Sequence, residues 1–190
     1  MILFGDEASF AQWGSLSYTW APVGEQPLVK TTGKRKAYKE FGAVEFFSGR
    51  LFSRGIEGRF NADSYMTFLS YVLAQTSEPL FLVQDGASYH RAAKVKRFFQ
   101  EHAERLTVVQ LPSYSPDYNP IELLWRAVKR LATHNRYFPE LASLAAAVEQ
   151  ALAFFAAQPQ QIKSLFGLYR DRTAQPLSQM AESITFPDDL

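Results

Sequence analysis

Residues 80–86 read LFLVQDG, a continuous apolar run that ends at Asp85 and Gly86. A run of this kind is typical of a strand that is covered on both faces, as in a parallel sheet. A helical pattern follows at residues 88–102, and a second short apolar run follows at residues 106–111. Because a helical crossover returns the chain to a parallel neighbour, this alternation predicts parallel strands with helices packed on the sheet.

The sequence before this stretch predicts three strands that do not alternate with helices. Residues 1–6 form a short apolar run that ends at Asp6, and residues 38–47 and 50–56 are separated by a Ser-Gly pair. The glycine favours a hairpin because it readily adopts the positive φ of a tight turn. The five expected strands therefore predict an α/β fold, with a mixed five-stranded sheet and helices on both faces.

Three more helices are expected from apolar residues that recur at helical spacing. They begin near residue 63, where Asp63 or Ser64 is the expected N-cap, at residue 121 and near residue 139. We expect one domain over residues 1–157 and a C-terminal tail over residues 158–190, made of a short helix and a loosely ordered segment.

The composition excludes several classes of protein. The chain has 190 residues, 47% of them hydrophobic, with a net charge of +1 and no cysteine. It can bury enough apolar surface to fold without cross-links, and it cannot hold disulfides, Cys-ligated zinc or a catalytic thiol. The apolar stretches are far shorter than the roughly 20 residues of a membrane span, so we expect no membrane association and a cytoplasmic location.

Three acidic residues stand where such a fold places its ligands. Asp6 and Asp85 each end an apolar run, and Glu122 lies in the first turn of the helix that begins at residue 121. If the two strands are parallel neighbours, their ends meet at one edge of the sheet. Carboxylates about 4 Å apart repel by roughly 1 to 4 kcal/mol per pair unless a cation is bound. Oxygen ligands without cysteine favour Mg²⁺ or Mn²⁺, and two such ions serve phosphoryl transfer in nucleases.

The sequence around the three acids forms distinctive blocks. They read FGDEASF at residues 4–10, VQDGASYH at residues 83–90 and LPSYSPDYNPIELLW at residues 111–125. These blocks closely resemble the catalytic blocks of bacterial insertion-sequence transposases related to mariner, which belong to the DDE superfamily of endonucleases. The resemblance implies a ribonuclease-H-like catalytic domain in which Asp6, Asp85 and Glu122 hold two Mg²⁺ or Mn²⁺ ions.

The same resemblance implies a function and its partners. A transposase of this family cuts DNA at transposon ends and joins it to target DNA, and we expect a homodimer as the active complex. Family members begin with helix-turn-helix modules that bind the transposon ends, and no such residues precede Asp6 in this sequence. We therefore expect either a fragment or a second reading frame whose helix-turn-helix half is made separately. The alternatives are a ribonuclease-H-like nuclease for other nucleic acids and an inactive remnant that only binds.

Several of these residues also have simpler structural interpretations. In a capping box, Asn119 is the N-cap and Glu122 bonds back to it, with no catalytic role for either residue. Asp85 before a glycine is often a turn residue, and Asn119 could contact a metal-bound water instead of capping the helix. His90 is expected to support the site by orienting a phosphate or a carboxylate, or else to be an ordinary hydrogen-bonding histidine. Glu7 is expected to point to the opposite face of its strand.

Basic residues gather in three places that suit phosphate binding. Glu122, Arg126 and Lys129 share one face of their helix at about 100° per residue, so a basic strip continues from the expected site. The expected nucleic-acid-binding residues are Lys34, Arg35, Lys36, Arg91, Lys94, Arg126, Lys129 and Arg130. The alternative for each group is a solvated surface with no ligand.

Overall fold

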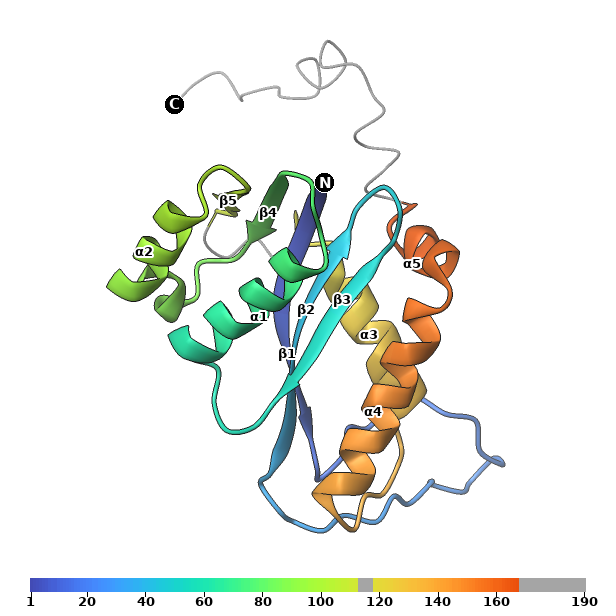
Figure 1. Cartoon of the computed structure of the whole chain (residues 1–190). Helices are drawn as coiled ribbons and strands as arrows, with labels where there is room; N and C mark the ends of the chain where they lie inside the picture. The colour runs from blue at the N-terminus through green and yellow to red at the C-terminus, as the bar shows by residue number, and fades with distance from the viewer. Residues whose placement is uncertain (113–117, 168–190) are drawn as a thin grey trace, which may run out of the picture.

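The computed structural model describes residues 1–112 and 118–167. Its elements in chain order are β1 (Ile2–Ala11), β2 (Ala37–Glu45), β3 (Leu51–Ile56), α1 (Ala62–Ala74), β4 (Leu80–Gln84), the short 3₁₀ helix η1 (Ser88–Arg91), α2 (Ala93–Glu101), β5 (Leu106–Gln110), α3 (Ile121–Ala132), α4 (Leu141–Ala156) and α5 (Pro159–Leu165). The strands form one five-stranded sheet in the order β3-β2-β1-β4-β5 (Figure 1). The mixed sheet that the sequence predicts is therefore confirmed.

The central strand β1 is longer than the sequence predicts. It does not end at Asp6 but continues to Ala11, because its second half pairs antiparallel with β2. Its parallel pairing with β4 is shorter and ends where Phe4 lies opposite Val83. When this register is continued for two residues beyond the last pair, Asp6 is level with Asp85. Two acidic residues that are far apart in sequence, one in β1 and one directly after β4, are thus brought to neighbouring parts of the sheet.

Helices cover both faces of the sheet, as expected (Figure 1). Side chains of β1 alternate between the faces, so Leu3 packs with α1 and α2 on one side. Phe10 packs on the other side, in the core that is formed with α3, α4 and α5. The two cores lie back to back across the sheet, and the side chains of Asp6 and Glu7 fall on opposite sides of it.

Two helix boundaries differ from the sequence prediction. The N-cap of α1 is Asn61, neither Asp63 nor Ser64, because the Asn61 side chain accepts hydrogen bonds from both of those backbone amides in a capping box. The helix expected over residues 88–102 is divided into η1 and α2. Ala92 is extended between them, with φ −60° and ψ 144°, which interrupts the helical hydrogen bonds.

The last helices close the core on the α3 side. Ile162 and Phe166 are fully buried in the core that also contains the apolar residues of α3 and α4. No single helix of the described residues is long and apolar enough to cross a membrane, and α4 and α5 reach that length and composition only as a pair bent by 92°. The domain boundary at residue 157 stays a prediction, and residues 168–190 lie outside the described residues.

Glu40 of β2 is a carboxylate inside this core. Its side chain is 3% exposed, and its Oε2 atom has no hydrogen-bond partner. Burial raises the pKa of Glu40 to about 7 from a usual value of 4.5. The folded protein therefore binds a proton that the unfolded chain releases near pH 4.5. The contribution of Glu40 to stability is therefore highest below that pH, falls as the pH rises towards 7, and decreases by about 3 kcal/mol in all.

The substitution Glu40→Gln is expected to remove this pH dependence. The neutral amide resembles the protonated acid, so the variant should unfold with nearly the same free energy as the wild type at pH 5. At pH 8 it should be more stable by up to about 3 kcal/mol. Urea unfolding at the two pH values measures this, with exposed Glu57→Gln as the matched control. Equal stability of Glu40→Gln and wild type at pH 8 would contradict the assignment.

Candidate active site

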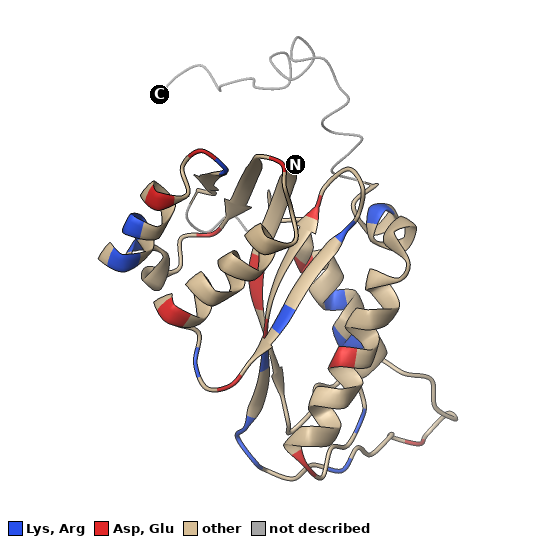
Figure 2. Ribbon diagram, viewed as in Figure 1, with Lys and Arg blue, Asp and Glu red and all other residues tan. Residues whose placement is uncertain are grey.

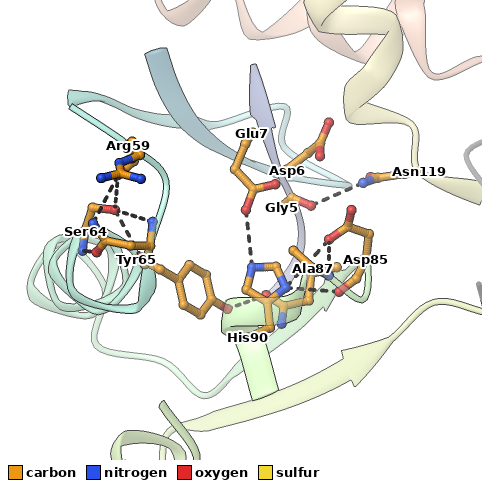
Figure 3. A network of polar contacts seen from close by, with 12 residues as sticks. Gly5, Asp6, Glu7, Arg59, Ser64, Tyr65, Asp85, Ala87, His90 and Asn119 are labelled. Carbon is orange, nitrogen blue, oxygen red and sulfur yellow. Dashed lines mark hydrogen bonds and ion pairs between the residues drawn. The ribbon is translucent and has the colours of Figure 1, made fainter. Parts of the chain in front are cut away.

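Asp6 lies in the middle of β1 and faces α3 (Figure 3). Its Oδ2 atom accepts a hydrogen bond of 3.0 Å from Nε1 of Trp125. Burial raises the pKa of Asp6 to about 7, and the negative charges of Glu7, Asp85 and Glu122 raise it as well. Asp6 is thus a poorly solvated carboxylate, near other carboxylates, that a bound cation would stabilise in its charged form.

Trp125 is the partner of Asp6 that the sequence does not reveal. The helical apolar pattern assigns this residue to the core, and it is indeed 4% exposed. Its ring lies over Gly42, where an added Cβ would stand 2.5 Å from Trp125 Cη2. Gly42 is the β2 residue that pairs with Asp6, so the missing side chain leaves room for the indole beside the carboxylate. The available signal in the sequence was a tryptophan at a predicted core position, because a buried indole N–H usually finds a hydrogen-bond partner.

Asp85 is the first residue after β4. Its side chain is 54% exposed. Its Oδ1 accepts a hydrogen bond of 3.1 Å from the backbone amide of Ala87, which stabilises a tight turn. The turn interpretation is therefore correct as local structure, and it leaves the other carboxylate oxygen available to a ligand.

Glu122 lies in the first turn of α3, and it does not form the capping box that the sequence permits. The N-cap is Pro120, and no side chain caps the helix. The Asn119 side chain instead donates a hydrogen bond of 3.2 Å to the carbonyl oxygen of Gly5 in β1. The predicted capping role of Asn119 is thus wrong, because this amide connects the start of α3 to β1. Its Oδ1 atom is buried without a partner.

Asp6 and Glu122 line one pocket, together with Arg126 and Lys129 of α3. Glu122, Arg126 and Lys129 lie on successive turns of the helix, as the sequence predicts. Figure 2 shows acidic positions in the centre of the sheet beside basic positions on α3. The pocket therefore combines carboxylates that can hold cations with basic groups that can hold phosphates.

The other expected basic residues do not line this pocket. Arg130 and Arg91 are exposed on α3 and η1, and Lys94 forms an ion pair with Asp63. Lys34, Arg35 and Lys36 precede Ala37, which pairs with Ala11, five register positions from Asp6. Ala37 is about 17 Å along the strand from the site at 3.3 Å per residue, and the three basic residues come before it. Lys34 donates to the carbonyl oxygen of Pro139, whereas Arg35 lines a separate pocket beside Trp13.

The carboxylate oxygens of Asp6, Asp85 and Glu122 are of the donor type that divalent cations such as Mg²⁺ prefer. Among the described residues, the set of three whose donor atoms all lie within 4.8 Å of one another is Glu7, Asp85 and His90, rather than Asp6, Asp85 and Glu122. Metal–oxygen distances of about 2.1 Å and an ion spacing of about 3.5 to 4 Å hold ligands of a two-ion site further apart than this. Hard oxygen ligands and the raised pKa of Asp6 suit Mg²⁺ or Mn²⁺.

Comparison with known proteins identifies the family. Residues 1–145, which contain all three acids, match the family model described as DDE superfamily endonuclease. The chain belongs to this family. The chain is 22% identical over 200 residues to the Tc3 transposase of Caenorhabditis elegans, covering 97% of this chain and 58% of that protein. It is 24% identical over 136 residues to a protein of insertion element IS630 from Shigella sonnei, covering 70% of this chain and 39% of that protein. The chain thus spans about half the length of these relatives.

Solved structures confirm the ribonuclease-H-like fold. The Mos1 transposase in a paired-end complex with the left transposon end matches with a TM-score of 0.62 and 16% identity, over 86% of this chain and 52% of that one. The catalytic core of bovine immunodeficiency virus (BIV) integrase matches with a TM-score of 0.51 and 14% identity, over 90% and 96% of the two chains. Mos1 paired-end complexes with Mn and with Mg also match, and the family uses divalent metals.

The indole hydrogen bond to Asp6 gives a first test of the site. Trp125→Phe is expected to raise the metal concentration for half-maximal binding by about tenfold or more, since removing a hydrogen-bond partner of a metal ligand lowers metal affinity by about 10- to 100-fold. Calorimetric titration with Mn²⁺ measures this. Leu124→Ala, which changes a fully buried side chain on the same helix, is the control for lost packing. If both variants bind Mn²⁺ like the wild type, the hydrogen bond has no part in the site.

Proposed function

We propose that this chain is the catalytic domain of a DNA transposase, which cuts DNA at transposon ends and joins the cut end to target DNA. The observation that carries the proposal is the register of β1 and β4. The ladder ends at Phe4 and Val83, two residues before Asp6 and Asp85 respectively, and Asp6 lines a pocket together with Glu122. Membership of the DDE family supports the same assignment.

In this proposal, the carboxylates of Asp6, Asp85 and Glu122 hold two Mg²⁺ or Mn²⁺ ions. When bound, such ions lower the pKa of the attacking water or 3′-hydroxyl and stabilise the charge that develops on the transferred phosphate. Trp125 keeps the Asp6 carboxylate in place through its indole N–H. Asn119 holds the first turn of α3, and with it Glu122, against β1.

The basic residues of α3 have a separate part in the proposal. Arg126 and Lys129 line the pocket beside the acids, where they can hold the phosphates that flank the bond to be cut. DNA as a partner is supported by the solved Mos1 complexes, which contain transposon ends. We also propose a homodimer as the active complex and a helix-turn-helix half that supplies recognition of the transposon ends.

Cleavage assays with the purified chain test this function. The chain should nick supercoiled plasmid DNA in Mg²⁺ or Mn²⁺ but not in EDTA, and it should join a pre-cut transposon end to a target plasmid. RNA–DNA hybrid and branched DNA substrates test the alternative ribonuclease-H-like activity. Preferential cleavage of hybrids, with no joining of DNA ends, would replace the transposase by that alternative. Metal binding without any cleavage or joining would contradict both.

A further inference from the structure

His90 joins the two strands that carry Asp6 and Asp85, on the side of the sheet away from α3. It lies in η1 with an exposed fraction of 6%. Its Nδ1 atom is 3.1 Å from the backbone carbonyl oxygen of Asp85. On the other side of the ring, its Nε2 atom is 3.2 Å from Oε1 of Glu7. Figure 3 shows the ring between the two acidic residues, with Glu7 and Asp6 pointing in different directions from β1.

The backbone of Asp85 needs such a contact. The parallel pairing of β4 with β5 ends at Gln84, so the following residue is outside the ladder of strand hydrogen bonds. At the following residue, Gly86, an added Cβ would clash with the side chain of Gln110. The Nδ1–H of His90 donates to the carbonyl oxygen of Asp85 and takes the place of the missing strand partner. This bond fixes the point from which the exposed Asp85 carboxylate projects.

The imidazole ring is itself held on several sides. Its centroid is 4.4 Å from that of the Tyr65 ring and 4.6 Å from that of the Tyr89 ring. The Tyr65 hydroxyl donates a hydrogen bond to the side chain of Gln84, which ties this packing to the end of β4. Glu7 closes the remaining side, although its contact with Nε2 does not have hydrogen-bond alignment.

We propose that His90 and Glu7 are positioning residues for Asp85, an inference that rests on the proposed function of the site. His90 fixes the backbone at the end of β4 through Nδ1, and Glu7, 3.2 Å from Nε2, closes the other side of the ring and limits its movement. The close grouping of Glu7, Asp85 and His90 then serves to hold Asp85 in position and is not a second metal centre. Partners of this kind change metal affinity by about 10- to 100-fold when they are removed.

Two substitutions of His90 separate the two ring contacts. Asparagine places an amide N–H near the position of Nδ1, whereas glutamine places one near the position of Nε2. His90→Asn should therefore bind Mn²⁺ within about threefold of the wild type, and His90→Gln should need about 10-fold more Mn²⁺ for half-saturation. Calorimetric titration measures binding without any need for activity, and thermal unfolding without metal reports folding. Glu7→Ala should weaken binding in the same direction by a smaller factor.

The matched control is His102, whose Nδ1 atom lies 2.9 Å from the carbonyl oxygen of Phe98 in α2. His102→Asn and His102→Gln should leave Mn²⁺ binding unchanged. The inference would be overturned if the wild type and both His90 variants reached half-saturation at the same Mn²⁺ concentration. This holds also if the variants unfolded at a lower temperature than the wild type. If His90→Gln does not fold, the comparison of Glu7→Ala with the wild type decides. If Asp85→Asn loses Mn²⁺ binding but the His90 and Glu7 variants bind Mn²⁺ like the wild type, this inference is wrong and the proposed function still stands.

Discussion

Asp85→Asn is expected to lower metal-dependent DNA nicking by about three orders of magnitude. In the proposed function this carboxylate helps to hold ions, and such ions contribute several kcal/mol to the stability of a phosphoryl-transfer transition state. The variant should fold normally because Asp85 is exposed and its Oδ1, which lies 3.6 Å from Nδ1 of His90, accepts a hydrogen bond from the Ala87 amide. An asparagine oxygen can accept the same bond, so the turn after β4 should be kept.

The assay compares initial nicking rates of supercoiled plasmid over a range of Mg²⁺ and Mn²⁺ concentrations. The matched control is Asp63→Asn, which also changes an exposed aspartate but one that pairs with Lys94, away from the site. It should nick DNA at the rate of the wild type. An Asp85→Asn variant that folds and still cuts DNA within a few-fold of the wild type would show that Asp85 holds no essential ion.

The second large effect is expected for DNA binding by the double variant Arg126→Ala, Lys129→Ala. If each side chain makes one charged hydrogen bond to a phosphate, the two together contribute about 3 kcal/mol, or about 100-fold in affinity at low salt. Each lost phosphate contact should also reduce the slope of log affinity against log salt by about 0.9. The double variant should therefore show a slope smaller by about 2 on duplex DNA.

Fluorescence anisotropy with a labelled duplex over a series of KCl concentrations measures both quantities. The control is the double variant Arg59→Ala, Lys96→Ala, which removes the same charge from exposed positions that do not line the pocket. A non-specific effect of net charge would lower affinity equally in the two double variants. That result, or an unchanged slope for Arg126→Ala, Lys129→Ala, would contradict a phosphate-binding role for the pocket.

Much of the fold could be predicted because its signals are local. The apolar run before Asp85 and the glycine at the β2–β3 turn each determine one element from a few neighbouring residues. The length of β1 could not be predicted in this way. Its second half is stabilised by pairing with β2, and the sequence between residues 12 and 36 gives no indication of that register.

The candidate site could likewise be predicted only in part from local sequence. Asp6 and Asp85 could be selected from the sequence because each ends an apolar run, where an open α/β sheet places its ligands. Glu122 could be selected because it lies in the first turn of α3, and family resemblance supports all three choices. Trp125, the partner of Asp6, could not be selected, because its hydrogen bond joins residues of distant elements. His90 could be selected, because it lies five residues after Asp85 in the same block. Local spacing also favoured a capping box at Asn119, whereas the long-range hydrogen bond to Gly5 takes that amide instead.

The most direct test is the location of bound metal. Crystals grown with Mn²⁺ and a DNA end can be measured at a wavelength where manganese scatters anomalously. The account predicts anomalous peaks among the carboxylates of Asp6, Asp85 and Glu122, with Glu7 and His90 in contact with each other and not with metal. A peak bound by Glu7 and His90, with none beside Asp6 and Glu122, would contradict it.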